Sequence, residues 1–367
     1  MNDGASRAVD RLRGGAAARP DARSGTAAAV VGKLSAVRES PRTALRASAL
    51  HMRKTVRLAR EGRFSECRGY LEELLLGRNG HYQALQDAAD GEYAEREVMG
   101  NRLRLDAFDP GVARTLLAYG AHEQRSTDAF AAELRALRDR VDGPVTMLDV
   151  GANVGYFTLL AARTLGERSD IYAVEPEPEN LSLLEANVRA NGYSGVVDTT
   201  RRAIGGSNGP VDLHISDYSN RHAVGAVPEE GAATYTDGGR ETVEQRTVAR
   251  FFEERSIDPA TVNAARMDVE GYEHAVVDGM RPVLDGDQPL VLHVELHPAL
   301  DDQQRRTVID ALRGAGLEVV AAVADEDAAG VQSRMAWHGV DLDVDSFEGV
   351  EAALRDGDAA VELVCSR

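Results

Sequence analysis

In the second half of the chain, apolar residues occur in two patterns, short continuous runs and helical spacing. Short apolar runs predict strands at 145–150, 171–174, 196–203, 262–269 and 291–296, and apolar residues at helical spacing predict helices at 154–165 and 178–190. Strands that alternate with helices build a mostly parallel sheet with helices on both faces. The pattern therefore predicts an α/β fold with a doubly wound sheet, whose ligands bind beyond the carboxyl ends of the strands.

The first 140 residues have a different pattern. Residues 1–42 are rich in Ala, Gly, Arg and Asp without either period, and we predict a disordered tail there. Helical spacing dominates 43–140, with a loosely alternating stretch at 96–106, which predicts a helical extension with one strand. We assign 141–367 to the main domain. Within it, the long polar segment 217–241 is typical of a lid that faces the substrate.

A strand, a glycine turn and a helix follow one another at 147–158. Gly151 permits a tight turn and Gly155 permits close packing at the start of the helix, because neither carries a Cβ atom. A dinucleotide fingerprint would have glycine where this chain has Asn153 and Tyr156. The helix N-terminus suits a single carboxylate, so the turn favours the methionine moiety of S-adenosylmethionine over NAD.

Residues at the ends of the next two strands extend this predicted cofactor site. Glu175 ends the second strand, where a carboxylate can accept both hydrogen bonds of a ribose diol. Ala203 and Ile204 end the third strand, where they would contact the adenine, although core positions would explain them equally well.

Acidic and histidine side chains follow the fourth and fifth strands. Asp268 could accept the proton of an acceptor hydroxyl or orient that hydroxyl, and His297 is the alternative base because its ordinary pKa is near neutrality. Glu270 and Glu295 could line the same cleft or cap helices, with Glu270 in the first turn of the helix after strand four. These four side chains could also converge on a divalent ion, but their spacing is not a ligand signature, so we predict no metal.

The net charge and the number of cysteines limit the possible binding partners and the cellular compartment of the protein. The 367-residue chain has a formal net charge of -18, which opposes a nucleic-acid partner because that affinity comes from Lys and Arg. We find neither a secretion signal nor an apolar run long enough for a membrane span. Cys67 and Cys365 are too few for a disulfide framework, so we predict a cytoplasmic protein.

Three motifs, in this order along the chain, resemble those of the FkbM-type methyltransferases. They are Asp-Val-Gly-Ala-Asn-Val-Gly at 149–155, Asp-Val-Glu-Gly-Tyr-Glu at 268–273 and Glu-Leu-His at 295–297. The resemblance covers about 102–322 and includes Gly-Ala-His-Glu at 120–123. Two departures concern the acceptor side: Thr247-Val-Ala-Arg replaces a usual Leu-Asp pair, and Arg266 replaces a usual lysine.

The resemblance implies a Rossmann-like class I methyltransferase that uses S-adenosylmethionine. It also implies that Asp149, Gly151, Asn153, Gly155 and Glu175 hold the cofactor, with Asp268 near the reacting methyl group. The usual reaction would be O-methylation of a sugar, glycan or secondary metabolite. A methyltransferase that acts on nitrogen or on a protein, a non-catalytic S-adenosylmethionine-binding module and an NAD-dependent oxidoreductase remain alternatives. The oligomeric state stays open.

Overall fold

The computed structural model describes residues 52, 55–76, 78–216, 219, 222–224, 239–324, 340–342, 344–356 and 360–367. The predicted tail at 1–42 and most of the predicted lid at 217–241 lie outside the described residues. The chain divides into two compact units between Asn79 and Gly80. Helix α4 (Phe64–Leu76) belongs to the first unit. Residues 80–140, which the sequence assigned to an extension, share the second unit with the sheet.

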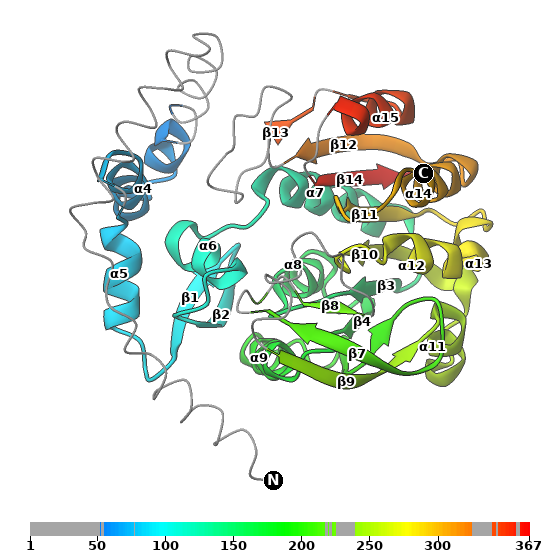
Figure 1. The fold of residues 1–367 in the computed structure, drawn as a ribbon, viewed down its shortest axis with the longest axis horizontal. Coiled ribbons are helices and arrows are strands. Elements are labelled where there is room, and N and C mark those ends of the chain that lie inside the picture. The colour runs from blue at the N-terminus through cyan, green and yellow to red at the C-terminus, as the bar shows by residue number, and fades with distance from the viewer. Residues whose placement is uncertain are drawn as a thin grey trace. The chain divides into compact units, whose positions relative to one another are not determined.

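The second unit is built on an eight-stranded sheet with the order β13-β12-β14-β11-β10-β3-β4-β5 (Figure 1). Five neighbouring strands are parallel, namely β11 (Val291–Leu296), β10 (Val262–Met267), β3 (Val145–Val150), β4 (Ser169–Val174) and β5 (Val197–Thr200). β14 (Val361–Ser366) runs antiparallel between β11 and β12 (Glu318–Ala324), and β13 (Val340–Asp341) pairs antiparallel at the edge. The predicted mostly parallel α/β sheet is confirmed.

Helices cover both faces of this sheet. α7 (Gln124–Arg140), α8 (Tyr156–Leu165) and α9 (Pro178–Ala190) pack on one face, whereas α11 (Val248–Arg255), α12 (Glu273–Gly279), α13 (Arg281–Leu284) and α14 (Asp302–Gly314) pack on the other. α15 (Phe347–Asp356) packs against β12, and a short 3-10 turn (Pro259–Thr261) leads into β10. Every residue of β3 and β10 is buried, as expected for central strands covered on both sides. Among the described residues, no helix is long and apolar enough to cross a membrane.

The stretch at 96–106, predicted as one strand, is instead part of a hairpin. β1 (Tyr93–Val98) and β2 (Asn101–Asp106) pair antiparallel, because Met99 and Gly100 both adopt positive φ, at 50° and 77°, and reverse the chain in two residues. Asn187 of α9 fastens the hairpin, accepting from the Arg104 N–H at 2.7 Å and donating to its carbonyl at 3.2 Å. α5 (Gly80–Asp87) and α6 (Val112–Tyr119) flank it.

The predicted third strand, 196–203, is also corrected. β5 ends at Thr200, and Ala203–Ile204 form β6 of a separate four-stranded sheet with the order β6-β9-β7-β8. The Arg202 N–H donates to the Thr200 carbonyl at 3.1 Å, which turns the chain away from the central sheet. β9 (Gly239–Arg246) then pairs with β6, and β7 (Gly209–Ile215) and β8 (Ala223–Val224) complete the layer.

Candidate functional site

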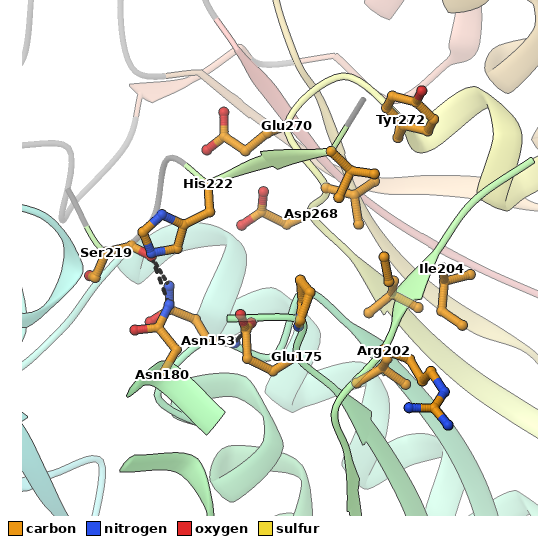
Figure 2. A pocket seen from close by; sticks show the side chains of 17 residues that line it. Asn153, Glu175, Asn180, Arg202, Ile204, Ser219, His222, Asp268, Glu270 and Tyr272 are labelled. Atoms are coloured by element: carbon orange, nitrogen blue, oxygen red, sulfur yellow. Dashed lines mark hydrogen bonds between the residues drawn. The ribbon is translucent and has the colours of Figure 1, made fainter. Parts of the chain in front are cut away.

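A pocket lies at the carboxyl ends of β3, β4 and β10 (Figure 2). Most of the predicted site residues line it, namely Gly151, Asn153, Glu175, Ala203, Ile204, Asp268 and Glu270. Asp149, Gly155, Glu295 and His297 are not among its lining residues. The pocket thus has one wall from the glycine turn and Glu175, an apolar wall from β6, and an acidic wall after β10.

The glycine turn holds its shape through backbone contacts. The N–H groups of Gly151 and Ala152 both donate to the Val174 carbonyl, at 3.0 and 3.1 Å, and join the ends of β3 and β4. Gly151 has φ of 80°, and a Cβ there would lie 2.0 Å from the Asp268 carbonyl oxygen. A Cβ at Gly155 would instead lie 2.6 Å from Leu184, so this glycine packs α8 against α9. Only the first glycine therefore shapes the pocket itself.

Asp149 lies beneath the pocket and supports its floor. It is fully buried, and its Oδ2 accepts the Thr158 hydroxyl at 2.5 Å. Because Asp149 is on β3 and Thr158 is on α8, this bond fixes the helix to the strand on either side of the glycine turn.

Glu175 is buried at the pocket wall with one backbone donor on each carboxylate oxygen. The Asn153 N–H donates to Oε2 at 2.8 Å, and the Glu177 N–H donates to Oε1 at 2.9 Å. Burial nevertheless raises the pKa of Glu175 to about 8. Each oxygen keeps a further lone pair, so the carboxylate has room for two more donors from a ligand.

Asp268 follows β10 on the acidic wall, and the Arg266 side chain holds its carboxylate in place. Its Oδ2 accepts from Nη2 of Arg266 at 2.6 Å. Glu295 is hydrogen-bonded to Asp268, and burial together with the Asp268 charge raises the pKa of Glu295 well above its ordinary range. Glu295 is therefore a neutral carboxyl that donates its proton to Asp268, rather than a second charge in the cleft.

Glu270 faces the pocket from a loop, which corrects its predicted place in a helix. α12 begins at Glu273, and Glu270 has a positive φ of 53° before it. His297 lies behind Glu270, with Nε2 at 3.0 Å from its Oε2, and its Nδ1 accepts from the Ala299 N–H at 3.1 Å. Burial lowers the pKa of His297, but Glu270 outweighs this effect, and the net pKa is raised above the ordinary value.

Ser219 joins the pocket to distant parts of the chain, and no sequence motif marks it. Its carbonyl accepts from the side-chain amides of Asn153 and Asn180, at 2.7 and 2.9 Å. Its N–H and hydroxyl both donate to the Asp109 carboxylate, at 2.9 and 2.6 Å. His222, which also lines the pocket, accepts from the Ser216 N–H at 3.1 Å, and burial lowers the pKa of its imidazole to about 4.

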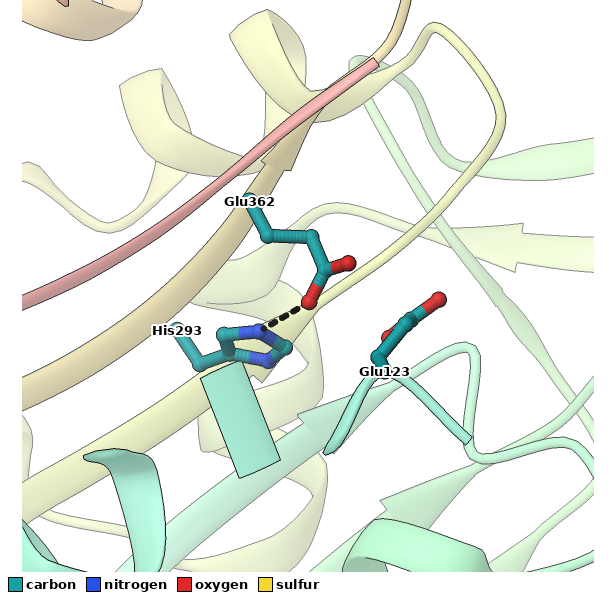
Figure 3. A group of neighbouring side chains, drawn as sticks. All are labelled: Glu123, His293 and Glu362. Atoms are coloured by element: carbon teal, nitrogen blue, oxygen red, sulfur yellow. Dashed lines mark hydrogen bonds and ion pairs between the residues drawn. The ribbon is translucent and has the colours of Figure 1, made fainter. Parts of the chain in front are cut away.

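A buried polar group connects α7, β11 and β14. Glu123, His293 and Glu362 bring three potential ligand atoms within 4.8 Å of one another (Figure 3). Protein partners already engage them: His293 contacts Glu362 at 3.2 Å, the Ser126 hydroxyl donates to Glu362, and His122 pairs with Glu123 at 2.9 Å. Burial lowers the pKa of His293 to about 4. We interpret the group as a hydrogen-bonded network that ties the C-terminal strand to the start of α7.

The sequence model described as "Methyltransferase FkbM domain" matches residues 149–333, which is half of the chain. Ribosomal protein L11 methyltransferases of Bacillus cereus (strain AH820) and Bacillus anthracis (strain A0248) are each 30% identical over 133 residues, which span 36% of this chain. The match covers 39% of the length of each relative.

Solved structures of methyltransferases also match. The precorrin-6y C5,15-methyltransferase from Geobacter metallireducens GS-15 matches at 13% identity and a TM-score of 0.32, over 65% of this chain and 87% of that chain. An S-adenosylmethionine-dependent methyltransferase from Agrobacterium tumefaciens matches at 11% identity and a TM-score of 0.38, over 76% and 70% of the two chains.

The contact between Gly151 and the Asp268 carbonyl can be tested by a paired glycine replacement. Gly192 has a similar φ of 76° but nothing within 4 Å of a built Cβ. Gly192→Ala should cost about 1 kcal/mol from its backbone angle alone. Gly151→Ala should cost at least about 2 kcal/mol more in urea unfolding, because the Asp268 backbone must move. Equal losses in the two variants would contradict the contact.

Proposed function

Because the chain belongs to the FkbM methyltransferase family, we propose that it methylates a hydroxyl group of a sugar, glycan or secondary metabolite. The methyl donor is S-adenosylmethionine, as for the family, and the choice of acceptor is our proposal. The observation that carries it is the pair of carboxylates, Asp268 and Glu270, on the pocket wall opposite the cofactor residues. Two carboxylates offer several acceptors for hydrogen bonds, which suits an uncharged polyhydroxyl compound.

The residues of the pocket fit S-adenosylmethionine. Glu175 would accept the ribose hydroxyls on the lone pairs that its two backbone donors leave open. Val174, Ala203 and Ile204 offer an apolar wall for the adenine. Gly151 keeps the turn free of a side chain.

The acceptor must be aligned and must lose a proton. The bound cofactor supplies a methyl group made electrophilic by its sulfonium, so positioning of the acceptor oxygen accounts for much of the rate. Asp268 would accept a hydrogen bond from the acceptor hydroxyl and orient it. Asp268 already accepts hydrogen bonds from Arg266 and Glu295, and these two contacts fix the position of its carboxylate. We therefore assign it orientation rather than proton removal.

We assign proton acceptance to the Glu270 and His297 pair. Glu270 faces the pocket, whereas His297 lies behind it at 3.0 Å and cannot reach the acceptor except through Glu270. The hydroxyl proton would move to a Glu270 carboxylate oxygen, and the His297 imidazole would stabilise either protonation state of its neighbour. Asp268 and Glu270 thereby divide orientation and proton acceptance between them.

A protein acceptor is the second candidate. It is favoured by the similarity to ribosomal protein L11 methyltransferases, although the matched region is only 39% of their length. Such an acceptor would present an amine, and the acidic wall would attract its protonated form. The formal net charge of -18 argues against a nucleic-acid acceptor.

The pKa of Glu175 predicts a pH-dependent affinity for S-adenosylmethionine. Because that pKa is raised to about 8, Glu175 is mainly protonated at pH 6, and the ionised form that accepts both ribose hydroxyls increases as the pH rises. Calorimetric affinity should therefore increase roughly tenfold or more between pH 6 and pH 8 and level off above pH 9. Glu175→Gln should bind weakly without this pH dependence, whereas Glu179→Gln, an exposed control on α9, should behave as wild type. If the affinity of Glu175→Gln for S-adenosylmethionine still depended on pH, the titrating group would be a different one.

The acceptor class can be tested with radiolabelled S-adenosylmethionine on a panel of glycosides, phenols and purified ribosomal protein L11. We expect methylation of a hydroxyl compound. With that acceptor, Asp268→Asn and Glu270→Gln should each lower kcat about 100-fold or more, and the exposed control Asp278→Asn should retain it. Methylation of the protein alone would favour the second candidate. Full activity in Asp268→Asn and Glu270→Gln would refute the assigned roles.

A further inference from the structure

Arg266 is enclosed at the centre of the sheet. Among the residues that the structure describes, it is the only arginine or lysine in the buried interior, with 5% of its surface exposed. β10 lies between β3 and β11, and Arg266 pairs in register with Asp149 on one side and His293 on the other. A buried charge is costly unless it is paired and hydrogen-bonded, so its contacts should account for its presence.

The guanidinium contacts two separate parts of the pocket. Nη1 donates to the Gly151 carbonyl at 2.6 Å, and Nη2 donates to Asp268 Oδ2 at 2.6 Å. Asp149 Oδ1 lies 3.8 Å from Nη1, and the Phe157 ring centroid lies 4.6 Å from the guanidinium carbon. One planar group therefore holds the glycine turn and the acidic wall at a fixed separation, and the ring beneath it fixes the plane.

The same group determines where the proton lies in the acidic wall. Asp268 and Glu295 are hydrogen-bonded to each other, and only one of them contacts Arg266 directly. A positive charge at 2.6 Å favours the ionised form of the carboxyl that it touches. Burial and the neighbouring Asp268 charge raise the pKa of Glu295, so Glu295 is the carboxyl that keeps the proton.

We propose that Arg266 is a positioning residue for methyl transfer, which fixes the glycine turn and the ionised Asp268 carboxylate as one unit through its two-pronged guanidinium. Arginine stands here where related methyltransferases usually have a lysine, so the double contact is a feature of the guanidinium rather than of positive charge alone. A lysine has a single nitrogen on a shorter side chain and cannot occupy both donor positions. The inference rests on the proposed function, because it assigns Asp268 to the acceptor.

The test compares S-adenosylmethionine with S-adenosylhomocysteine, its neutral sulfide, by calorimetric titration of the full chain. The ratio of the two affinities reports the charge near the sulfonium, because both ligands share the ribose and the pH effect of Glu175 cancels. In the wild type we expect the ratio to favour S-adenosylmethionine, because Asp268 and Glu270 line the pocket that receives the sulfonium. Neither ligand requires an acceptor, so the outcome does not depend on whether the acceptor is a hydroxyl.

Arg266→Lys should weaken both ligands about tenfold, since the glycine turn loses its donor. Its preference for the sulfonium should also fall at least threefold, because one ammonium nitrogen cannot hold the glycine turn and Asp268 together. Arg189→Lys, an exposed substitution on α9, is the matched control and should leave both affinities unchanged. A purely structural role would lower the melting temperature without changing the ratio of the two affinities.

A folded Arg266→Lys variant with wild-type affinities and an unchanged ratio would overturn the proposal. If that variant does not fold, Phe157→Leu provides the second measurement, because it removes the ring beneath the guanidinium and leaves every charge in place. Phe157→Leu should also weaken both ligands and lower the preference for the sulfonium, by smaller factors than Arg266→Lys. An unchanged affinity and an unchanged ratio in Phe157→Leu would then overturn the proposal.

Discussion

One buried positive charge organises the acidic centre of this protein. Asp149 and Glu123 lie close to Arg266, Asp268 accepts a hydrogen bond from it at 2.6 Å, and burial raises the pKa of Glu295 beside them. Without that guanidinium, the carboxylates at the ends of the central strands would repel one another or bind protons. The arrangement explains how an acidic cleft can exist at the most enclosed part of the sheet.

The pocket itself depends on the sheet order. β3, β4 and β10 are neighbours, so the glycine turn, Glu175 and Asp268 meet at one edge although they are far apart in sequence. Glu175 is held mainly by backbone donors, on the side proposed for the cofactor, whereas Asp268 and Glu270, on the side proposed for the acceptor, are held by other side chains. The first arrangement suits a cofactor common to a family, and the second allows the acceptor to differ between members.

The sequence predicted those parts of the fold that are determined by residues close together along the chain. The periodicity of apolar residues predicted the central strands and α9. The glycine turn was predicted from Gly151, at a position with no room for a Cβ atom. Ala203 and Ile204 line the pocket, but they belong to a different sheet from the predicted strand. The sequence did not reveal this, because the turn after Thr200 carries no Gly or Pro signal. Ser219 could not be predicted, since its partners come from three distant segments.

The central claim is that the site after β3 and β4 binds S-adenosylmethionine rather than a dinucleotide. Its most direct test is calorimetric titration of the full chain with S-adenosylmethionine and, separately, with NAD under the same conditions. The account predicts saturable micromolar binding of S-adenosylmethionine and no heat of binding with NAD. Binding of NAD in preference to S-adenosylmethionine, or binding of neither, would contradict it.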